Sequence, residues 1–270
     1  MKTRCTLLIT TLCMLASTIV PTHAAVSDWV HSEGGKARLS ALSDGADGKI
    51  TAILEIDPAP GWKTYWQNPG DAGLAPQIDL SAGRNLKLVK VSYPAPEIGN
   101  DEGGRFLGYH KPVTLVLELV KPVPADPAEL DATILIGLCK DICLPFQATF
   151  NLPLADASQP QADEFMKIQM AKAELPDRPS PGFDVPKAGL TADKTYFEAT
   201  IVAPEGAPLE IAISPSGGLQ LGVQEKQSVI DGKTVVRYPV TRLPTSLEGA
   251  NVTMVVKAAG RSIETTLSVD

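Results

Sequence analysis

Residues 132–152 read A-T-I-L-I-G-L-C-K-D-I-C-L-P-F-Q-A-T-F-N-L. Two strand-like runs, Ala132–Leu138 and Phe146–Leu152, flank Cys139 and Cys143. Residues four apart in an extended strand are about 13 Å apart, whereas a disulfide accepts about 5.5 Å between Cα atoms. The two cysteines can therefore bond only if the chain turns between them, through a hairpin loop or one turn of helix.

Further short runs of the same kind precede this stretch and are separated by glycine, proline and asparagine. The other predicted strands of this first group are Lys36–Ser43, Ile50–Asp57, Trp62–Trp66, Leu86–Tyr93 and Val113–Val120. We expect a turn at Asn68-Pro69-Gly70-Asp71. Seven short strands at this spacing predict a β-sandwich over residues 25–154.

Residues 155–190 interrupt the strand pattern. Ala162–Ala173 has helical character, and four prolines follow at positions 176, 179, 181 and 186. We interpret this segment as a Pro-rich linker that contains one short helix.

Strand patterns return in residues 191–270. The predicted strands are Tyr196–Val202, Leu209–Ser214, Leu219–Val223, Val235–Val240, Asn251–Ala258 and Ser262–Val269. The pairs Asp231-Gly232 and Ala259-Gly260 are hairpin turn signals. The sequence therefore predicts an all-β protein with a second, smaller β-sandwich, which carries no cysteine, no histidine and no evident chemistry.

The first 24 residues have the pattern of a secretory signal peptide. Lys2 and Arg4 precede an apolar run over residues 7–20, and Thr22-His23-Ala24 supplies a small residue at the expected cleavage point. The run is shorter than the roughly twenty residues that a membrane span needs. Cleavage after Ala24 removes Cys5 and Cys13, so the mature chain keeps Cys139 and Cys143 in an oxidising space outside the cytoplasm.

The charge of the mature chain argues against nucleic acid as a partner. Loss of Lys2 and Arg4 leaves 22 basic residues against 31 acidic ones, a net charge of −9. This balance favours neither a phosphate backbone nor an anionic membrane surface. No later apolar run is long enough to insert into a membrane.

The cysteine pair has three interpretations. A structural disulfide that closes so short a ring would stabilise the fold by only about 2 kcal/mol. Two thiolates, completed by His110, would suit Cu(I). An exchangeable disulfide would make the pair the centre of a redox protein without a cofactor.

Four blocks of sequence resemble one known family. They are Gly61-Trp62-Lys63-Thr64-Tyr65-Trp66-Gln67-Asn68-Pro69-Gly70-Asp71-Ala72-Gly73-Leu74, Tyr93-Pro94-Ala95-Pro96, Gly108-Tyr109, and Leu138-Cys139-Lys140-Asp141-Ile142-Cys143-Leu144-Pro145. In this order they are similar to the N-terminal periplasmic domain of DsbD-type thiol:disulfide interchange proteins, especially the ScsB branch, associated with suppression of copper sensitivity.

The resemblance implies two immunoglobulin-like sandwiches and a redox function. Cys139 and Cys143 would be the catalytic pair of a thiol:disulfide oxidoreductase. The pair would take electrons from a transmembrane reductase and pass them to oxidised periplasmic proteins, such as thioredoxin-like proteins. The transmembrane carrier and a C-x-x-C thioredoxin-like domain are not in this sequence, so the electron donor would be a separate membrane protein. The alternative is a periplasmic protein that binds or delivers copper through the same cysteines.

In DsbD an aromatic residue on a loop caps the disulfide. Residues 101–109 occupy the corresponding place, with Phe106 and Tyr109 as the candidate caps. Around Trp62–Trp66, alternation puts Trp62, Thr64 and Trp66 on one face and Lys63 and Tyr65 on the other. We assign these aromatic residues to the core of the fold rather than to function.

Overall fold

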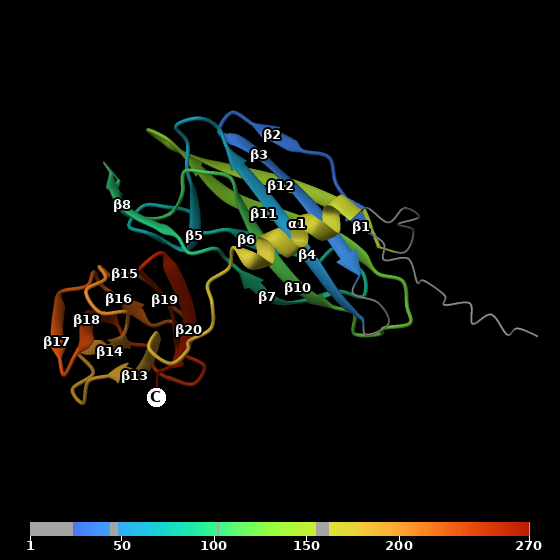
Figure 1. Ribbon diagram of the computed structural model, residues 1–270. Coiled ribbons are helices and arrows are strands. Elements are labelled where there is room, and N and C mark those ends of the chain that lie inside the picture. Colours follow the sequence, from blue (N-terminus) through green and yellow to red (C-terminus); the bar gives the residue numbers. More distant parts are fainter. Residues whose placement is uncertain (1–23, 44–47, 102, 155–161, 270) are drawn as a thin grey trace, which may run out of the picture.

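The computed structural model describes residues 24–43, 48–101, 103–154 and 162–269, which form strands and one helix (Figure 1). The signal peptide predicted at residues 1–24 lies outside the described residues, except for Ala24. Within the described ranges, no helix has the length and apolar character that a membrane span requires.

A six-stranded sheet and a three-stranded sheet form the first sandwich. The larger sheet has the order β1 (Ala24–Val26), β3 (Gly35–Ser43), β4 (Lys49–Pro58), β10 (Val113–Val120) and β7 (Lys87–Ser92), with β2 (Val30–Ser32) also paired with β3. The smaller sheet has the order β12 (Cys143–Pro153), β11 (Glu129–Cys139) and β6 (Gln77–Asp79).

The core of this sandwich lies between the two sheets. Alternate residues of β4 and β10, such as Leu54 and Leu115, pack with Leu130, Ile134 and Ile136 of β11, and all five are at most 1% exposed. The two-residue period of the strands turns these apolar side chains to the same side. This packing fixes the register of β11, at whose end the first cysteine lies.

A third, small sheet is attached to the end of the sandwich where the cysteines lie. It has the order β5 (Thr64–Gly70), β9 (Gly104–Tyr109) and β8 (Glu97–Asp101). The turn expected at residues 68–71 is wrong, because β5 continues to Gly70. Its pairing with β9 shifts between Tyr65 and Gly70, and Gly70 has a positive φ of 90°. Gly70 can adopt this conformation because it has no side chain, so the strand continues through an irregularity where the sequence pattern predicted a reversal of the chain.

The segment predicted as a linker contains two ordered elements. Helix α1 (Ala162–Ala173) packs Ile168 and Ala171 against Ile53 and Val116, on the outer face of the six-stranded sheet. Strand β13 (Asp184–Leu190) pairs with β14 (Tyr196–Val202). The second sheet system therefore begins before the predicted boundary at residue 191.

Two sheets form the second sandwich. One has the order β13, β14, β18 (Lys233–Arg242) and β16 (Gln220–Leu221), with β17 (Lys226–Ile230) also paired with β18. The other has the order β15 (Glu210–Pro215), β19 (Asn251–Ala258) and β20 (Arg261–Ser268). Phe197, Tyr238 and Met254, all fully buried, lie in their common core. The prediction of an all-β protein with immunoglobulin-like sandwiches is confirmed.

The second sandwich contacts the first beside the small β5–β9–β8 sheet. The buried Ala212 and Val255 belong to the core cluster of the first sandwich. The Asn68 side-chain amide donates to the carbonyl oxygen of Ile213 at 2.6 Å, and the Arg105 guanidinium donates to that of Ile211 at 3.4 Å. Strands β5 and β9 are therefore held from both sandwiches.

Candidate functional site

Cys139 and Cys143 lie at the end of a long antiparallel hairpin. Strands β11 and β12 pair along eleven residues each, and the last pair of the register is Cys139 with Cys143. The three residues Lys140, Asp141 and Ile142 connect them, so the predicted hairpin is confirmed. The turn brings the two Cα atoms to 4.1 Å, and a disulfide joins the sulfur atoms.

The two cysteines have different environments. Cys139 is 2% exposed and forms a small buried cluster with Tyr65 and Phe106. The backbone N–H and carbonyl of Cys139 point away from β12, and each forms a 2.9 Å hydrogen bond with the backbone of Lys63. Cys143 is exposed. An incoming thiolate can therefore reach Cys143 more easily than Cys139.

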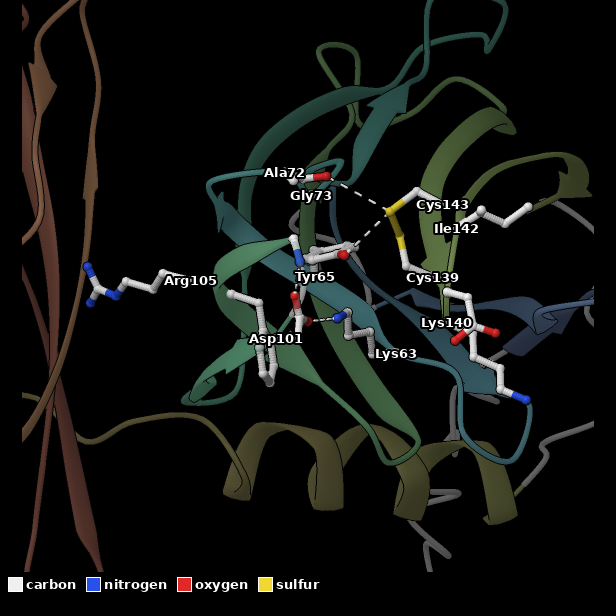
Figure 2. Close-up of a pocket in the computed structure, with 13 residues that line it drawn as sticks. Lys63, Tyr65, Ala72, Gly73, Asp101, Arg105, Cys139, Lys140, Ile142 and Cys143 are labelled. Carbon is white, nitrogen blue, oxygen red and sulfur yellow. Dashed lines mark hydrogen bonds and ion pairs between the residues drawn. A yellow bond between two sulfur atoms is a disulfide. The ribbon is translucent and has the colours of Figure 1, made fainter.

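A cavity of about 300 Å³ opens beside the disulfide. The cavity is lined by the loop residues 140–142, by Lys63 and Tyr65, by residues 72–73 and by the β8–β9 hairpin (Figure 2). Toward this cavity, the Cys143 sulfur lies 3.5 Å from the Tyr65 hydroxyl and 3.9 Å from the carbonyl oxygen of Ala72. In the disulfide form the Tyr65 hydroxyl is the donor, because the sulfur carries no proton.

Burial keeps the Tyr65 hydroxyl protonated. Desolvation raises the pKa of Tyr65 above its ordinary value, because burial penalises the charged phenolate. At neutral pH this side chain is therefore a neutral hydrogen-bond donor to the Cys143 sulfur.

The two predicted cap residues occupy different places. Phe106 is 8% exposed, lines the cavity and belongs to the buried cluster of Tyr65 and Cys139. A Cβ at Gly99, its partner on β8, would lie 2.1 Å from the ring, so only glycine leaves room for Phe106 in this position. Tyr109 instead lies in the core of the first sandwich, where its hydroxyl donates to the carbonyl oxygen of Pro94 at 2.7 Å. Of the two, Phe106 is the one that packs with Cys139, and its role as a cap stays a prediction.

His110, the third ligand of the copper hypothesis, points its ring at other partners. Its Nδ1 lies 2.8 Å from Glu97 Oε2, and its ring packs edge-on against Phe106 with 5.0 Å between centroids. Among the described residues, no group of three or more His, Cys, Asp or Glu side chains is placed to hold a metal ion. The copper site stays a prediction.

Lys63 and Tyr65 line the site, although the sequence analysis assigned the aromatic residues of this block to the fold and gave Lys63 no role. Alternation correctly separates them from Thr64 and Trp66, which are fully buried on the other face of β5. The face of Lys63 and Tyr65 turns toward the disulfide rather than toward solvent. A lysine inside the aromatic run Trp62–Trp66 was the available signal, since a lysine is rarely buried without a partner.

The family comparison covers this site. Residues 34–155 match the family model described as "Thiol:disulfide interchange protein DsbD, N-terminal". The resemblance to the DsbD N-terminal domain is confirmed. The matched region, hereafter the DsbD-type domain, contains both cysteines, the small sheet and the cavity.

Two solved structures are similar to this chain. The N-terminal periplasmic domain of ScsB from Proteus mirabilis has a TM-score of 0.69 and 22% sequence identity, and the match covers 91% of this chain and 98% of that one. Both sandwiches therefore have counterparts in that fold. The reduced N-terminal domain of DsbD from Neisseria meningitidis has a TM-score of 0.28 and 17% identity, covering 49% of this chain and 84% of that one. A search of curated proteins finds no significant match.

The family match and the paired cysteines support thiol–disulfide exchange as the general chemistry of the DsbD-type domain. Exchange requires attack on one sulfur of the disulfide, and Cys143 is the exposed residue of the pair.

Proposed function

We propose that this chain is a periplasmic thiol:disulfide oxidoreductase module. It relays two electrons from a membrane reductase to oxidised periplasmic proteins, through Cys139 and Cys143. The observation that carries this proposal is the pairing of an exposed cysteine with a buried one at the edge of a cavity.

The first half of the cycle reduces the pair. A thiolate of the reductase attacks the sulfur of Cys143, and the Cys139–Cys143 bond breaks as a new intermolecular disulfide forms. Cys139 leaves as a thiolate and takes up a proton. The second thiolate of the reductase then attacks the reductase sulfur that is bonded to Cys143, and Cys143 leaves as a thiolate. The reductase is now a disulfide, and this chain holds two thiols.

The second half delivers the electrons. The Cys143 thiolate attacks the disulfide of an oxidised protein and forms a second mixed disulfide. Cys139, which the β11–β12 hairpin holds beside it, then attacks Cys143 and restores the internal disulfide. The acceptor leaves with two thiols, so the electrons and protons balance over the cycle. Phe106 would cap the oxidised pair between these steps.

The reduction potential of the pair tests the proposal. We expect equilibration with glutathione buffers to give a potential above about −300 mV, because bonds below that value behave as inert structural disulfides. A lower value, with no reduction by a dithiol on the time scale of minutes, would contradict exchange and favour a structural bond.

Single-cysteine variants test the roles of the two sulfurs. We expect Cys139→Ala to trap a mixed disulfide through Cys143, both with dithiobis-nitrobenzoate and with the redox partner, because no resolving thiol remains. Cys143→Ala should trap little, since Cys139 is buried. Efficient trapping only by Cys143→Ala would reverse the assignment.

The copper alternative has its own test. If the protein binds copper, the reduced form should bind one Cu(I) ion, and His110→Ala should weaken that binding. Thiol exchange requires neither result. Titration of the reduced protein with Cu(I) in the presence of a competing chelator would separate the two.

A further inference from the structure

Lys63 is a buried amine in the site for which the exchange cycle gives no role. The residue is 8% exposed, and burial lowers the pKa of its amine. A buried lysine costs free energy unless its charge is paired. Its ammonium forms an ion pair with the Asp101 carboxylate (Figure 2). The ammonium also lies 4.9 Å from the centroid of the Phe106 ring. Lys63 therefore has both an anionic partner and an aromatic one.

These contacts connect two parts of the site. Through its backbone, Lys63 is hydrogen-bonded in both directions to Cys139. Through its side chain, it reaches Asp101 at the end of β8 and Phe106 in the middle of β9. One residue thus joins the cysteine strand to the β8–β9 hairpin that carries the cap.

Further attachments of the hairpin lie along β9. The backbone N–H of Asp71 donates to the carbonyl oxygen of Arg105 at 2.9 Å, and the backbone N–H of Arg105 donates at 2.8 Å to a carboxylate oxygen of Asp71. The Arg105 guanidinium extends away from the disulfide toward Ile211 of the second sandwich (Figure 2). At the tip, Asp101 pairs with Gly104 within the hairpin, so Lys63 is the residue that ties Asp101 to the cysteine side.

We propose that the Lys63–Asp101 ion pair is a latch that holds the β8–β9 hairpin, and with it Phe106, against the Cys139–Cys143 disulfide. Lys63 and Asp101 are then positioning residues for exchange, so this inference rests on the proposed function. Loss of one partner of this ion pair is costly, because it leaves the Lys63 ammonium in the site without its counter-charge.

Loss of the latch should make Cys143 more reactive. In the Cys139→Ala background, we expect Asp101→Asn to raise the rate of Cys143 alkylation by iodoacetamide about tenfold, the factor that corresponds to ~1.4 kcal/mol for a charged hydrogen bond. Lys63→Met should have a similar effect, and Lys63→Arg should restore the slow rate because it keeps the charge. In the otherwise unchanged protein, Asp101→Asn should speed reduction of the disulfide by dithiothreitol by a similar factor.

Lys36 provides the matched control. Its amine pairs with Asp57 at 3.3 Å and lies 4.7 Å from the centroid of the Trp29 ring, so it has the same kinds of partner as Lys63 but on β3, away from the cavity. Lys36→Met should leave both rates unchanged. An increase equal to that of Lys63→Met would show that general loosening of the fold, and not the latch, controls access.

Ionic strength separates a latch from simple packing. Salt at about 1 M should raise the alkylation rate of the Cys139→Ala protein two- to threefold, because the Asp101 side chain is 34% exposed and its attraction to Lys63 is partly screened. The same salt should have no effect after Asp101→Asn. Equal salt effects with and without Asp101→Asn would overturn the proposal.

The alkylation experiment in the Cys139→Ala background does not depend on the redox function of the protein. If the disulfide proves inert to dithiols while Asp101→Asn still speeds alkylation of Cys143, the proposed function fails and the latch stands. If exchange is fast and neither Asp101→Asn nor Lys63→Met changes either rate, the latch is excluded.

Discussion

The two sandwiches each contain a long hairpin in a three-stranded sheet, and the two hairpins end differently. In the first, β11 and β12 end with the pair Cys139 and Cys143 and a three-residue connection. In the second, β19 and β20 end with Ala258 and Arg261, joined by Ala259 and Gly260, both at positive φ. The hairpin is thus a common scaffold element, and the residues at its end decide whether it carries chemistry.

A second difference is what covers the end of the hairpin. The small β5–β9–β8 sheet places Lys63, Tyr65 and Phe106 beside the cysteines. In residues 184–269, the strands that the structure describes form the two sheets of the sandwich itself. The small sheet is therefore an addition to the first sandwich at the cysteine pair, and variants in the two domains should separate stability from reactivity.

The largest expected effects come from a matched pair of core truncations. Trp66 on β5 and Phe197 on β14 are both fully buried, so Trp66→Ala and Phe197→Ala should each lower the free energy of unfolding of their own sandwich by about 3–5 kcal/mol. Denaturant unfolding measures this loss.

Only Trp66→Ala should also change the rate of disulfide reduction, because Trp66 lies on the strand that carries Tyr65. The rate of disulfide reduction by dithiothreitol, measured under conditions where both variants are folded, would show the difference. An equal change in Phe197→Ala would mean that the two sandwiches are coupled through the site.

Removal of the second sandwich should have an intermediate effect. A chain of residues 25–178 keeps α1 and the cysteines but loses the contacts of Ala212 and Val255 with the first core. We expect it to fold with a stability about 2 kcal/mol lower, from the lost apolar burial, and to keep its disulfide exchange. Thermal unfolding and dithiol kinetics measure the two quantities. A folded truncation without exchange would show that the second sandwich contributes to the site.

The smallest effect should come from the hydroxyl group beside Cys143. Tyr65→Phe removes a 3.5 Å contact with the sulfur and keeps the ring, so we expect a change in reduction rate of about fivefold or less, as for one neutral hydrogen bond. Because burial raises the pKa of Tyr65, its hydroxyl stays protonated between about pH 6 and 9, and the ratio of the two rates should be constant there. A ratio that changes across this range would contradict the neutral-donor role.

The sequence predicted the strands with regular alternation best. Val113–Val120, Tyr196–Val202 and Asn251–Ala258 have the predicted bounds, because their side chains alternate between a core and another face. The hairpin around the cysteines followed from the distance that a disulfide allows. Strands β8 and β9 were not predicted, since the glycines and charges of residues 97–108 resemble a loop.

The candidate site was predicted only in part for the same reason. The cysteines are visible as a motif, and Phe106 follows from the family resemblance. Lys63, Tyr65 and Asp101 become neighbours of the disulfide only when Lys63, directly before β5, pairs with Cys139 and β5 pairs with β9. Both partners are about 40 or more residues away in the sequence. Local patterns do not contain that pairing.

The double backbone pairing of Cys139 with Lys63 has a consequence for the lifetime of mixed disulfides. The N–H and the carbonyl of Cys139 both bond to Lys63, and the preceding residues of β11 pair with β12, so backbone pairing holds Cys139 in place beside the disulfide. After a partner has bonded to Cys143, the free Cys139 thiol remains within reach at a high effective concentration, and its attack needs little loss of entropy. Intermediates with an acceptor should therefore resolve quickly, and complexes should accumulate only when Cys139 is removed.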